Sequence, residues 1–166
     1  IHRGDRVAII GNNGAGKSSL LKMTVGLLKP KRGEIRLKEQ LIHRLKAEEI
    51  SNVIGYVYQN PEGMFIEDSI EKDIAFSMRA RGIKDYQTRT EMLLTQFDLL
   101  ALRHRDGRLL SGGQMRRASL AIGVALSPQI LLLDEPTASL DMATRKRITS
   151  TLQTLSESIE TVMIAT

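Results

Sequence analysis

One nine-residue segment near the start of the chain constrains the fold more than any other. Residues 10–18 read Ile-Gly-Asn-Asn-Gly-Ala-Gly-Lys-Ser, which fits the pattern Gly-x-x-x-x-Gly-Lys-Ser. Glycines can adopt positive φ, so successive backbone N–H groups can turn toward a phosphate without interference from a Cβ atom. The segment therefore predicts a nucleotide-binding loop. The predicted contact residues are Gly11, Asn12, Asn13, Gly14, Ala15, Gly16, Lys17, Ser18 and Ser19.

The residues around this loop predict the strand and helix that such a loop requires. The apolar run 6–10 before it is typical of a strand buried on both faces. After it, Leu20, Leu21, Thr24, Val25 and Leu28 recur at helical spacing until Lys29-Pro30. The helix would aim its positive dipole end at the phosphates, while Lys17 supplies a charge and Ser18 a hydroxyl for Mg²⁺.

A second motif, which is acidic, lies far downstream at the end of the apolar run Ile130–Leu133. The next residues are Asp134, Glu135 and Pro136. Ligands of open α/β sheets bind beyond the carboxyl ends of the strands, so we expect both acids beside the loop. Adjacent strand residues point to opposite faces, which would place Asp134 on Mg²⁺ and Glu135 toward an attacking water. Taken alone, the run could also be an ordinary strand followed by a polar turn.

Between these motifs lies the segment Leu-Ser-Gly-Gly-Gln at residues 110–114. A serine and two glycines before an apolar run at 120–126 suit a helix N-terminus that could contact an anion, although no lysine follows them. With these five residues the chain resembles the ATP-binding cassette family, whose signature motif they match. The resemblance implies a head-to-tail dimer of identical or different subunits, in which Ser111, Gly112, Gly113 and Gln114 close over ATP bound by the other subunit.

Two more positions resemble the family's motifs. Gln59, after the apolar run 53–58, resembles the Q-loop glutamine, which touches Mg²⁺ or water and links the site to a transmembrane partner. Ser139-Leu140-Asp141 follows Glu135 as the family's D-loop does. Asp141 is also a predicted N-cap for a helix carrying Ile148, Leu152 and Leu155. The resemblance implies ATP and Mg²⁺ as cofactors and in-line hydrolysis, with Lys17, Gln59 and Glu135 as catalytic residues and Ser18, Gln59 and Asp134 around the metal.

The whole pattern predicts an α/β fold. We expect a P-loop NTPase core with a mostly parallel sheet at 1–59 and 127–166, and a helical subdomain at 60–126 that carries the signature motif. Residues 33–39 alternate as in a small antiparallel β part, and 161–165 look like a further strand. Residues 69–102 have helical spacing with a break at Gly82.

The segment after Gln59 indicates which subfamily of ATP-binding cassette proteins the chain resembles. Asn60-Pro61, Phe65 and the run Ser69–Phe76 resemble the ATPases of energy-coupling factor transporters, which import vitamins or cobalt and nickel ions. The resemblance implies a peripheral subunit at the cytoplasmic face of the membrane. Its docking groove would take a short helix of the membrane partner. Two other hypotheses stay open: a soluble ABC ATPase that acts on ribosomes or DNA, and a regulatory module that dimerises on ATP binding.

The ends of the chain depart from the family pattern. Neither an adenine-stacking aromatic residue before the loop nor a switch histidine after 161–165 is found; His2, His43 and His104 lie elsewhere and are expected at the surface. We therefore expect a fragment of a longer polypeptide, with hydrolysis a property of the parent.

Composition fits a globular domain without disulfides. The 166 residues carry no cysteine and a net charge of +5, but the basic residues are dispersed and the chain has only three tyrosines and three phenylalanines. A single-strand nucleic-acid surface would need aromatic stacking residues, so we expect no nucleic-acid partner. The basic residues, including Arg116 and Arg117, are predicted to lie on solvated faces.

Overall fold

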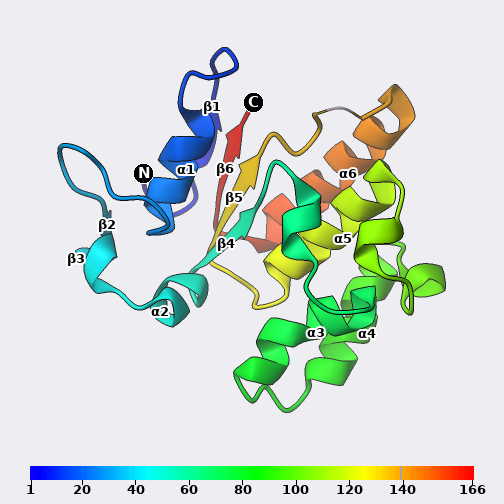
Figure 1. Cartoon of the computed structure of the whole chain (residues 1–166). Coiled ribbons are helices and arrows are strands. Elements are labelled where there is room, and N and C mark those ends of the chain that lie inside the picture. The colour runs from blue at the N-terminus through cyan, green and yellow to red at the C-terminus, as the bar shows by residue number, and fades with distance from the viewer. Residues whose placement is uncertain (139) are drawn as a thin grey trace.

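The centre of the molecule is a parallel four-stranded sheet. A computed structural model describes residues 1–138 and 140–166, and the side chains of all of these except 156 and 157. The strand order is β1 (Arg6–Ile9), β6 (Thr161–Ala165), β5 (Ile130–Asp134) and β4 (Ile54–Val57), as Figure 1 shows. Every neighbouring pair runs parallel. The predicted strands at 130–133 and 161–165 and the mostly parallel sheet are confirmed.

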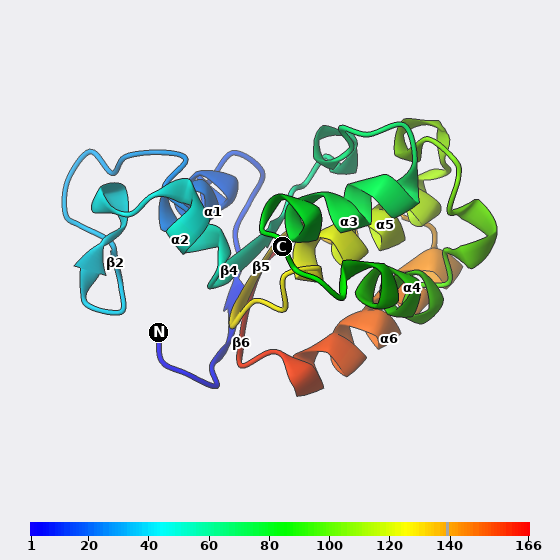
Figure 2. The same ribbon diagram turned by 90° about the horizontal axis from the view of Figure 1, so that it is seen from below.

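Alternate residues of β5 pack on opposite faces of the sheet. Leu132 joins an apolar cluster with Leu21 of α1 (Lys17–Thr24). Leu131 and Leu133 belong to a second cluster on the other face, together with α5 (Gly112–Val124) and α6 (Met142–Ser158). Figure 2 shows α1 on one side of the sheet and the other two helices on the opposite side. The sequence of β5 is continuously apolar because helices cover the sheet on both faces.

Two glycines allow α5 to approach β4 closely. A Cβ atom on Gly55 would lie 2.3 Å from the carbonyl oxygen of Gly123, and one on Gly123 would lie 2.5 Å from Cγ2 of Val57. Both distances are shorter than van der Waals contact, so neither site has room for a larger residue. This close approach fixes the signature helix against the strand that leads to Gln59.

The helices between β4 and α5 do not form a separate core. Here lie α3 (Ile70–Ala80), α4 (Tyr86–Gln96) and the short turns η2 (Pro61–Met64), η3 (Leu100–Leu102) and η4 (Gly107–Leu109). Gly82 has φ 65°, which confirms the predicted helices and the break between them. Their buried side chains, such as Ile74 and Phe97, share one cluster with Leu131 and Leu133. The division at residues 59/60 and 126/127 stays a prediction.

The antiparallel part is smaller than predicted. Only β2 (Arg36–Leu37) pairs with β3 (Gln40–Leu41), followed by η1 (Ile42–Arg44) and α2 (Ala47–Ser51). The expected strand at 33–39 is confirmed only at residues 36 and 37 and is wrong at 33–35 and at 38–39. Lys38 and Glu39 have φ 48° and 68° and form the turn between the two strands.

Two predictions around the phosphate-binding loop are wrong. The run 6–10 is not a strand buried on both faces: β1 ends at Ile9, it is an edge strand of the described sheet, and its residues are exposed or half-buried. The helix after the loop ends at Thr24 and not at Leu28. Gly26 adopts φ 73°, which stops the helix before Lys29-Pro30, and Leu28 is exposed.

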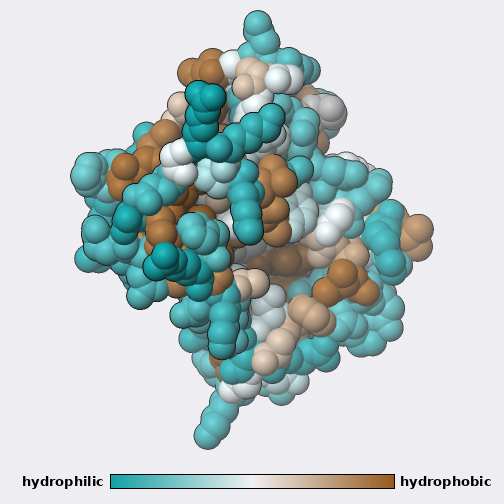
Figure 3. Space-filling model, turned by 60° about the vertical axis from the view of Figure 1, so that its left-hand side comes forward, coloured by the Kyte–Doolittle hydropathy of each residue, from teal (hydrophilic) through white to brown (hydrophobic). Residues whose placement is uncertain are grey.

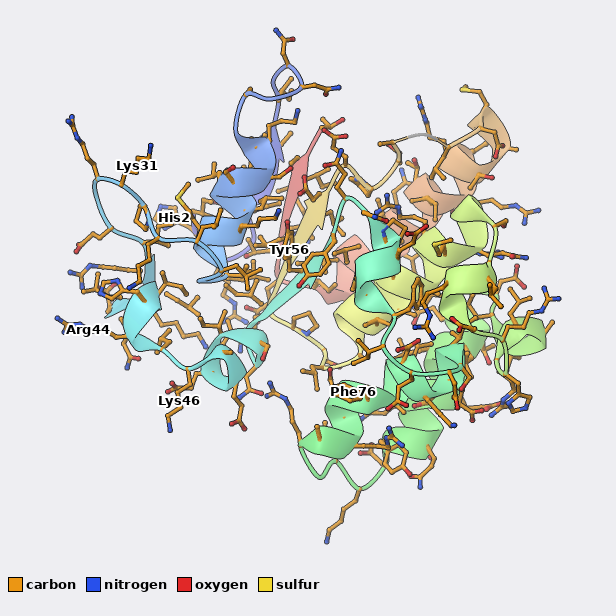
Figure 4. The ribbon with its side chains drawn as sticks, in the orientation of Figure 1. His2, Lys31, Arg44, Lys46, Tyr56 and Phe76 are labelled. Carbon is orange, nitrogen blue, oxygen red and sulfur yellow. The ribbon has the colours of Figure 1, made fainter. Side chains whose placement is uncertain are left out.

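Most of the predicted surface charge is confirmed. Lys31, Arg44 and Lys46 extend outward around β2 and β3 in Figure 4 and are exposed. All three histidines, His2, His43 and His104, are exposed as expected.

Candidate functional site

The loop between β1 and α1 leaves backbone donors open at the start of a helix. Gly14 and Gly16 have φ 82° and 94°, and a Cβ atom on either would meet no heavy atom within 4 Å. Gly16 is the N-cap of α1 and provides no side-chain cap. In the described part of the chain, the backbone N–H groups of Gly14, Gly16, Lys17 and Ser18 have no protein acceptor. Open N–H groups at a helix N-terminus suit the oxygens of a phosphate.

Lys17 lies across this loop. Its side chain is buried, with Nζ donating to the carbonyl oxygens of Gly11 at 2.8 Å and Asn12 at 3.3 Å. The same Nζ lies 3.4 Å from Oε1 of Glu135. The lysine therefore connects the loop to the acidic end of β5.

Asp134 is the last residue of β5, and hydroxyl groups contact both of its carboxylate oxygens. Ser18 Oγ donates to Oδ1 at 2.9 Å, and the Tyr56 hydroxyl donates to Oδ2 at 3.1 Å. Asp134 is only 1% exposed. Burial, and secondarily the charge of Asp134, raises the pKa of Tyr56, so this residue is a neutral donor.

Glu135 contacts different residues from Asp134, and its backbone does not continue the strand. Its φ is 46°, so the chain leaves the strand in a left-handed turn, and its N–H donates to the carbonyl oxygen of Ala165 at 2.9 Å. Besides the contact to Lys17, its carboxylate accepts a hydrogen bond from Nε2 of Gln59 at 3.0 Å. The structure thus brings Lys17, Gln59 and Glu135 together, and Ser18 and Asp134 beside them.

The donor set at this point fits Mg²⁺ and a polyphosphate. A hydroxyl and a carboxylate oxygen from Ser18 and Asp134 are hard ligands of the kind that Mg²⁺ prefers, and the open N–H groups of the loop suit phosphate. Gln59 is placed differently from the expectation for a metal ligand. Its amide contacts Glu135, and among the described residues it has no hydrogen bond to Ser18 or Asp134.

The signature residues lie at the N-terminus of α5. Ser111 and Gln114 form a capping box, in which Gln114 N donates to Ser111 Oγ at 3.4 Å and Ser111 N donates to Oε1 of Gln114 at 3.1 Å. Gly112 has open space where a Cβ would lie, whereas a Cβ on Gly113 would lie 2.6 Å from Cγ2 of Thr144. Within the described ranges, none of these residues has a hydrogen bond to the phosphate-binding loop.

Thr144 connects the signature motif to Asp141. Asp141 is the N-cap of α6, which confirms this prediction, and it accepts hydrogen bonds from Thr144 N at 2.9 Å and Thr144 Oγ1 at 2.6 Å. These bonds lower the pKa of Asp141. Ser139 of the predicted D-loop lies outside the described residues.

Two functional candidates were missed in the sequence: Tyr56 and Arg116. The prediction of a solvated Arg116 is wrong, because this residue is only 4% exposed. Its Nη1 donates to the carbonyl oxygen of Tyr58 at 2.9 Å and its Nη2 to that of Gln59 at 2.7 Å. Burial lowers the pKa of Arg116, while the charge of Asp134 acts in the opposite direction. The signals were a tyrosine inside an apolar strand and an arginine two residues after the signature motif.

The fold and this arrangement of loop, lysine and acidic strand end define the class of P-loop NTPases. A family model described as ABC transporter matches residues 1–138. The chain belongs to this ABC transporter family, which confirms the resemblance inferred from its motifs.

Several similar relatives are ATP-binding proteins of energy-coupling factor transporters. The chain is 37% identical over 155 residues to the energy-coupling factor transporter ATP-binding protein EcfA1 of Geobacillus kaustophilus, covering 92% of this chain and 56% of the relative. It is 35% identical to EcfA of Enterococcus faecium, covering 99% of this chain and 60% of the relative. The chain therefore spans somewhat over half the length of these relatives.

Two solved structures share the fold. One is cbiO1 from Clostridium perfringens, described as part of the ABC transporter complex cbiONQ: its TM-score is 0.83 at 31% identity, over 100% of this chain and 68% of that one. The other is a dimeric post-hydrolysis state of the ATP-binding cassette MJ0796 bound to ADP and Pi: its TM-score is 0.86 at 27% identity, over 100% of this chain and 76% of that one. In the described part of this chain, the helices are too short or too polar to cross a membrane.

Proposed function

We propose that this chain is the catalytic part of a subunit that binds and hydrolyses ATP to drive transport through a membrane partner. The observation that carries the proposal is the meeting of the loop end of α1 with the carboxyl end of β5. Lys17 Nζ lies 3.4 Å from Glu135, and Ser18 Oγ lies 2.9 Å from Asp134. An anion-binding helix terminus and two acids with different partners are what magnesium-dependent phosphoryl transfer requires.

Each residue then has a distinct task. The open N–H groups of the loop and the ammonium of Lys17 bind and orient the phosphates. Ser18 and Asp134 would hold Mg²⁺, whose charge offsets that of the phosphate oxygens. Glu135 accepts the proton of the attacking water, and Gln59 holds the Glu135 carboxylate by its amide.

A second subunit would complete the site. The cap at Ser111 lacks a lysine and, among the described residues, has no hydrogen bond to the phosphate-binding loop. Its role follows if Ser111, Gly112, Gly113 and Gln114 cover ATP held by another subunit. The dimeric state of the related cassette MJ0796 supports this arrangement.

A transmembrane subunit is the favoured partner, in an importer of a vitamin or metal ion. The named relatives are energy-coupling factor and cbiONQ subunits. A hollow of about 340 Å³ lies between the two helical sides of the molecule, lined by residues that include Met64, Ser77, Ile122, Leu126 and Pro128. Figure 3 shows hydrophobic surface within a hollow in the middle of the face turned to the viewer. Such a groove suits a short amphipathic helix, which would hold the subunit at the cytoplasmic face of the membrane.

The test is to purify the full-length protein from detergent-solubilised membranes and to measure phosphate release. We expect an integral membrane protein to copurify and phosphate release to require both ATP and Mg²⁺. Copurification with ribosomes or DNA instead would support a soluble ATPase. ATP binding without phosphate release from the assembled complex would support a regulatory module.

A further inference from the structure

We propose that Tyr56 is a positioning residue that fixes the carboxylate of Asp134 for metal binding. This inference rests on the proposed function, because it assigns a role toward the same Mg²⁺ site. The pattern of motifs does not include Tyr56, and the contact that reveals its role joins residues 78 positions apart.

The sheet register brings Tyr56 to this carboxylate. Tyr56 on β4 pairs with Leu132 on β5, and Asp134 lies two residues further along β5. Residues two apart on a strand share a face, so Tyr56, Leu132 and Asp134 lie on the face that α1 covers. Figure 4 shows Tyr56 on β4 in the middle of the molecule. Its hydroxyl reaches Oδ2 of Asp134 at 3.1 Å.

The hydroxyl groups of Ser18 and Tyr56 have different roles at Asp134. Ser18 donates to Oδ1 and is itself a proposed metal ligand. Tyr56 comes from another strand and donates to the second oxygen, Oδ2. With one donor on each oxygen, rotation of the buried carboxylate about its Cβ–Cγ bond would break a hydrogen bond inside the protein, where water does not replace it. Tyr56 therefore holds the orientation from the side of the carboxylate that Ser18 does not contact.

The neighbouring Tyr58 provides a matched control. It lies two residues along the same chain segment, and its ring packs edge-on against that of Tyr56 at a centroid distance of 4.8 Å. Its hydroxyl has no hydrogen-bond partner among the described residues. Tyr58→Phe removes the same atom as Tyr56→Phe and leaves Asp134 with both of its donors.

The experiment measures metal affinity separately from hydrolysis. Mn²⁺ replaces Mg²⁺ in the full-length protein saturated with ADP, and electron paramagnetic resonance counts free Mn²⁺ during a titration. We expect Tyr56→Phe to weaken Mn²⁺ binding about tenfold, since a hydrogen bond to a charged group is lost. Tyr58→Phe should bind Mn²⁺ as the wild type does. Binding of a fluorescent ADP analogue in EDTA should be equal in all three proteins.

A double-mutant cycle tests whether Tyr56 acts through Asp134. In an Asp134→Ala background, Tyr56→Phe should cause no further loss of Mn²⁺ affinity; an additional tenfold loss there would overturn the inference. Equal Mn²⁺ affinity in Tyr56→Phe and the wild type would also overturn it, as would equal losses in both tyrosine variants. These results leave the proposed function intact. Absence of Mn²⁺ and Mg²⁺ effects on ADP binding to the wild type would overturn both proposals.

Discussion

Two helices of this molecule begin with glycine-rich turns, and they differ in how the first backbone N–H groups of each helix are hydrogen-bonded. At α1 the N-cap is Gly16, which provides no side-chain cap, so the first N–H groups stay available. At α5 the N-cap is Ser111, which shares a capping box with Gln114. The end of α1 also has Lys17, Asp134 and Glu135 around it, whereas Ser111 has no lysine beside it in the sequence.

This difference indicates that the two helix ends have different roles, one in binding phosphate and metal and the other in covering a site. The end of α1 combines open donors, a buried cation and two acids, which together suffice to bind a metal-bound polyphosphate. At the end of α5 the capping box satisfies the N–H groups of Ser111 and Gln114. Packing fixes this end in place, through Gly113 on Thr144 and Arg116 on the segment that leads to Gln59. A rigid, self-capped terminus suits the second wall of a site whose chemistry is supplied elsewhere.

The largest expected effect comes from the acid at the α1 side. Glu135→Gln keeps the size of the side chain but removes the proton acceptor, so phosphate release should fall roughly 10²–10⁴-fold. ATP binding should persist and the dimer should accumulate in ATP. Phosphate release and size-exclusion chromatography measure the two results. Near-normal hydrolysis would contradict the role given to Glu135.

Loss of the cation at the same terminus should affect binding. Lys17→Ala removes a charge that the phosphates would contact, and we expect the affinity for a fluorescent ATP analogue to fall about 10–100-fold. Lys22→Ala, an exposed lysine on the same helix, is the control and should bind as the wild type does. If the two lysine variants bind alike, Lys17 is not a phosphate contact.

On the α5 side we expect an effect on stability. Arg116→Met leaves the carbonyl oxygens of Tyr58 and Gln59 without their charged donor, which should cost about 2 kcal/mol of unfolding free energy. Arg117→Met breaks only an ion pair with the exposed Asp98 and should cost less than about 1 kcal/mol. Urea denaturation measures both. Equal costs would show that Arg116 does not fix the segment that carries Gln59.

The smallest expected effect is the difference in stability between alanine variants of two glycines of the signature motif. Gly113→Ala would place a Cβ 2.6 Å from Cγ2 of Thr144, so Thr144 must move, and we expect a loss of about 1 kcal/mol. Gly112→Ala meets open space and should change stability by less than about 0.5 kcal/mol. Thermal unfolding distinguishes them. Similar melting temperatures would indicate that the signature turn does not depend on packing against α6.

The sequence predicts the parts of this molecule that local patterns control. The apolar run at 130–133 and the turn at 11–18 carry their own signals, and the sheet rule then brings Asp134 to Ser18. The helical spacing continues to Leu28 and Pro30 is a strong stop signal, but the positive φ of Gly26 ends α1 earlier, at Thr24.

Long-range packing explains the other omissions. The contact of Tyr56 with Asp134 depends on the register between β4 and β5, which no local pattern encodes. The dispersed basic residues, with no aromatic residues among them, predict a solvated Arg116. It is buried because the close approach of Gly123 to Gly55 presses α5 against β4, and the carbonyl oxygens after that strand accept its hydrogen bonds.

The most direct test of the account is calorimetric titration of the full-length protein with ATP, with Mg²⁺ and with EDTA. The turn before α1 and the acidic end of β5 are proposed to form one site for triphosphate and metal. We expect saturable ATP binding that is tighter in Mg²⁺ than in EDTA, and we expect Asp134→Ala to remove this difference. Absence of binding, or binding that neither Mg²⁺ nor the loss of Asp134 alters, would contradict it.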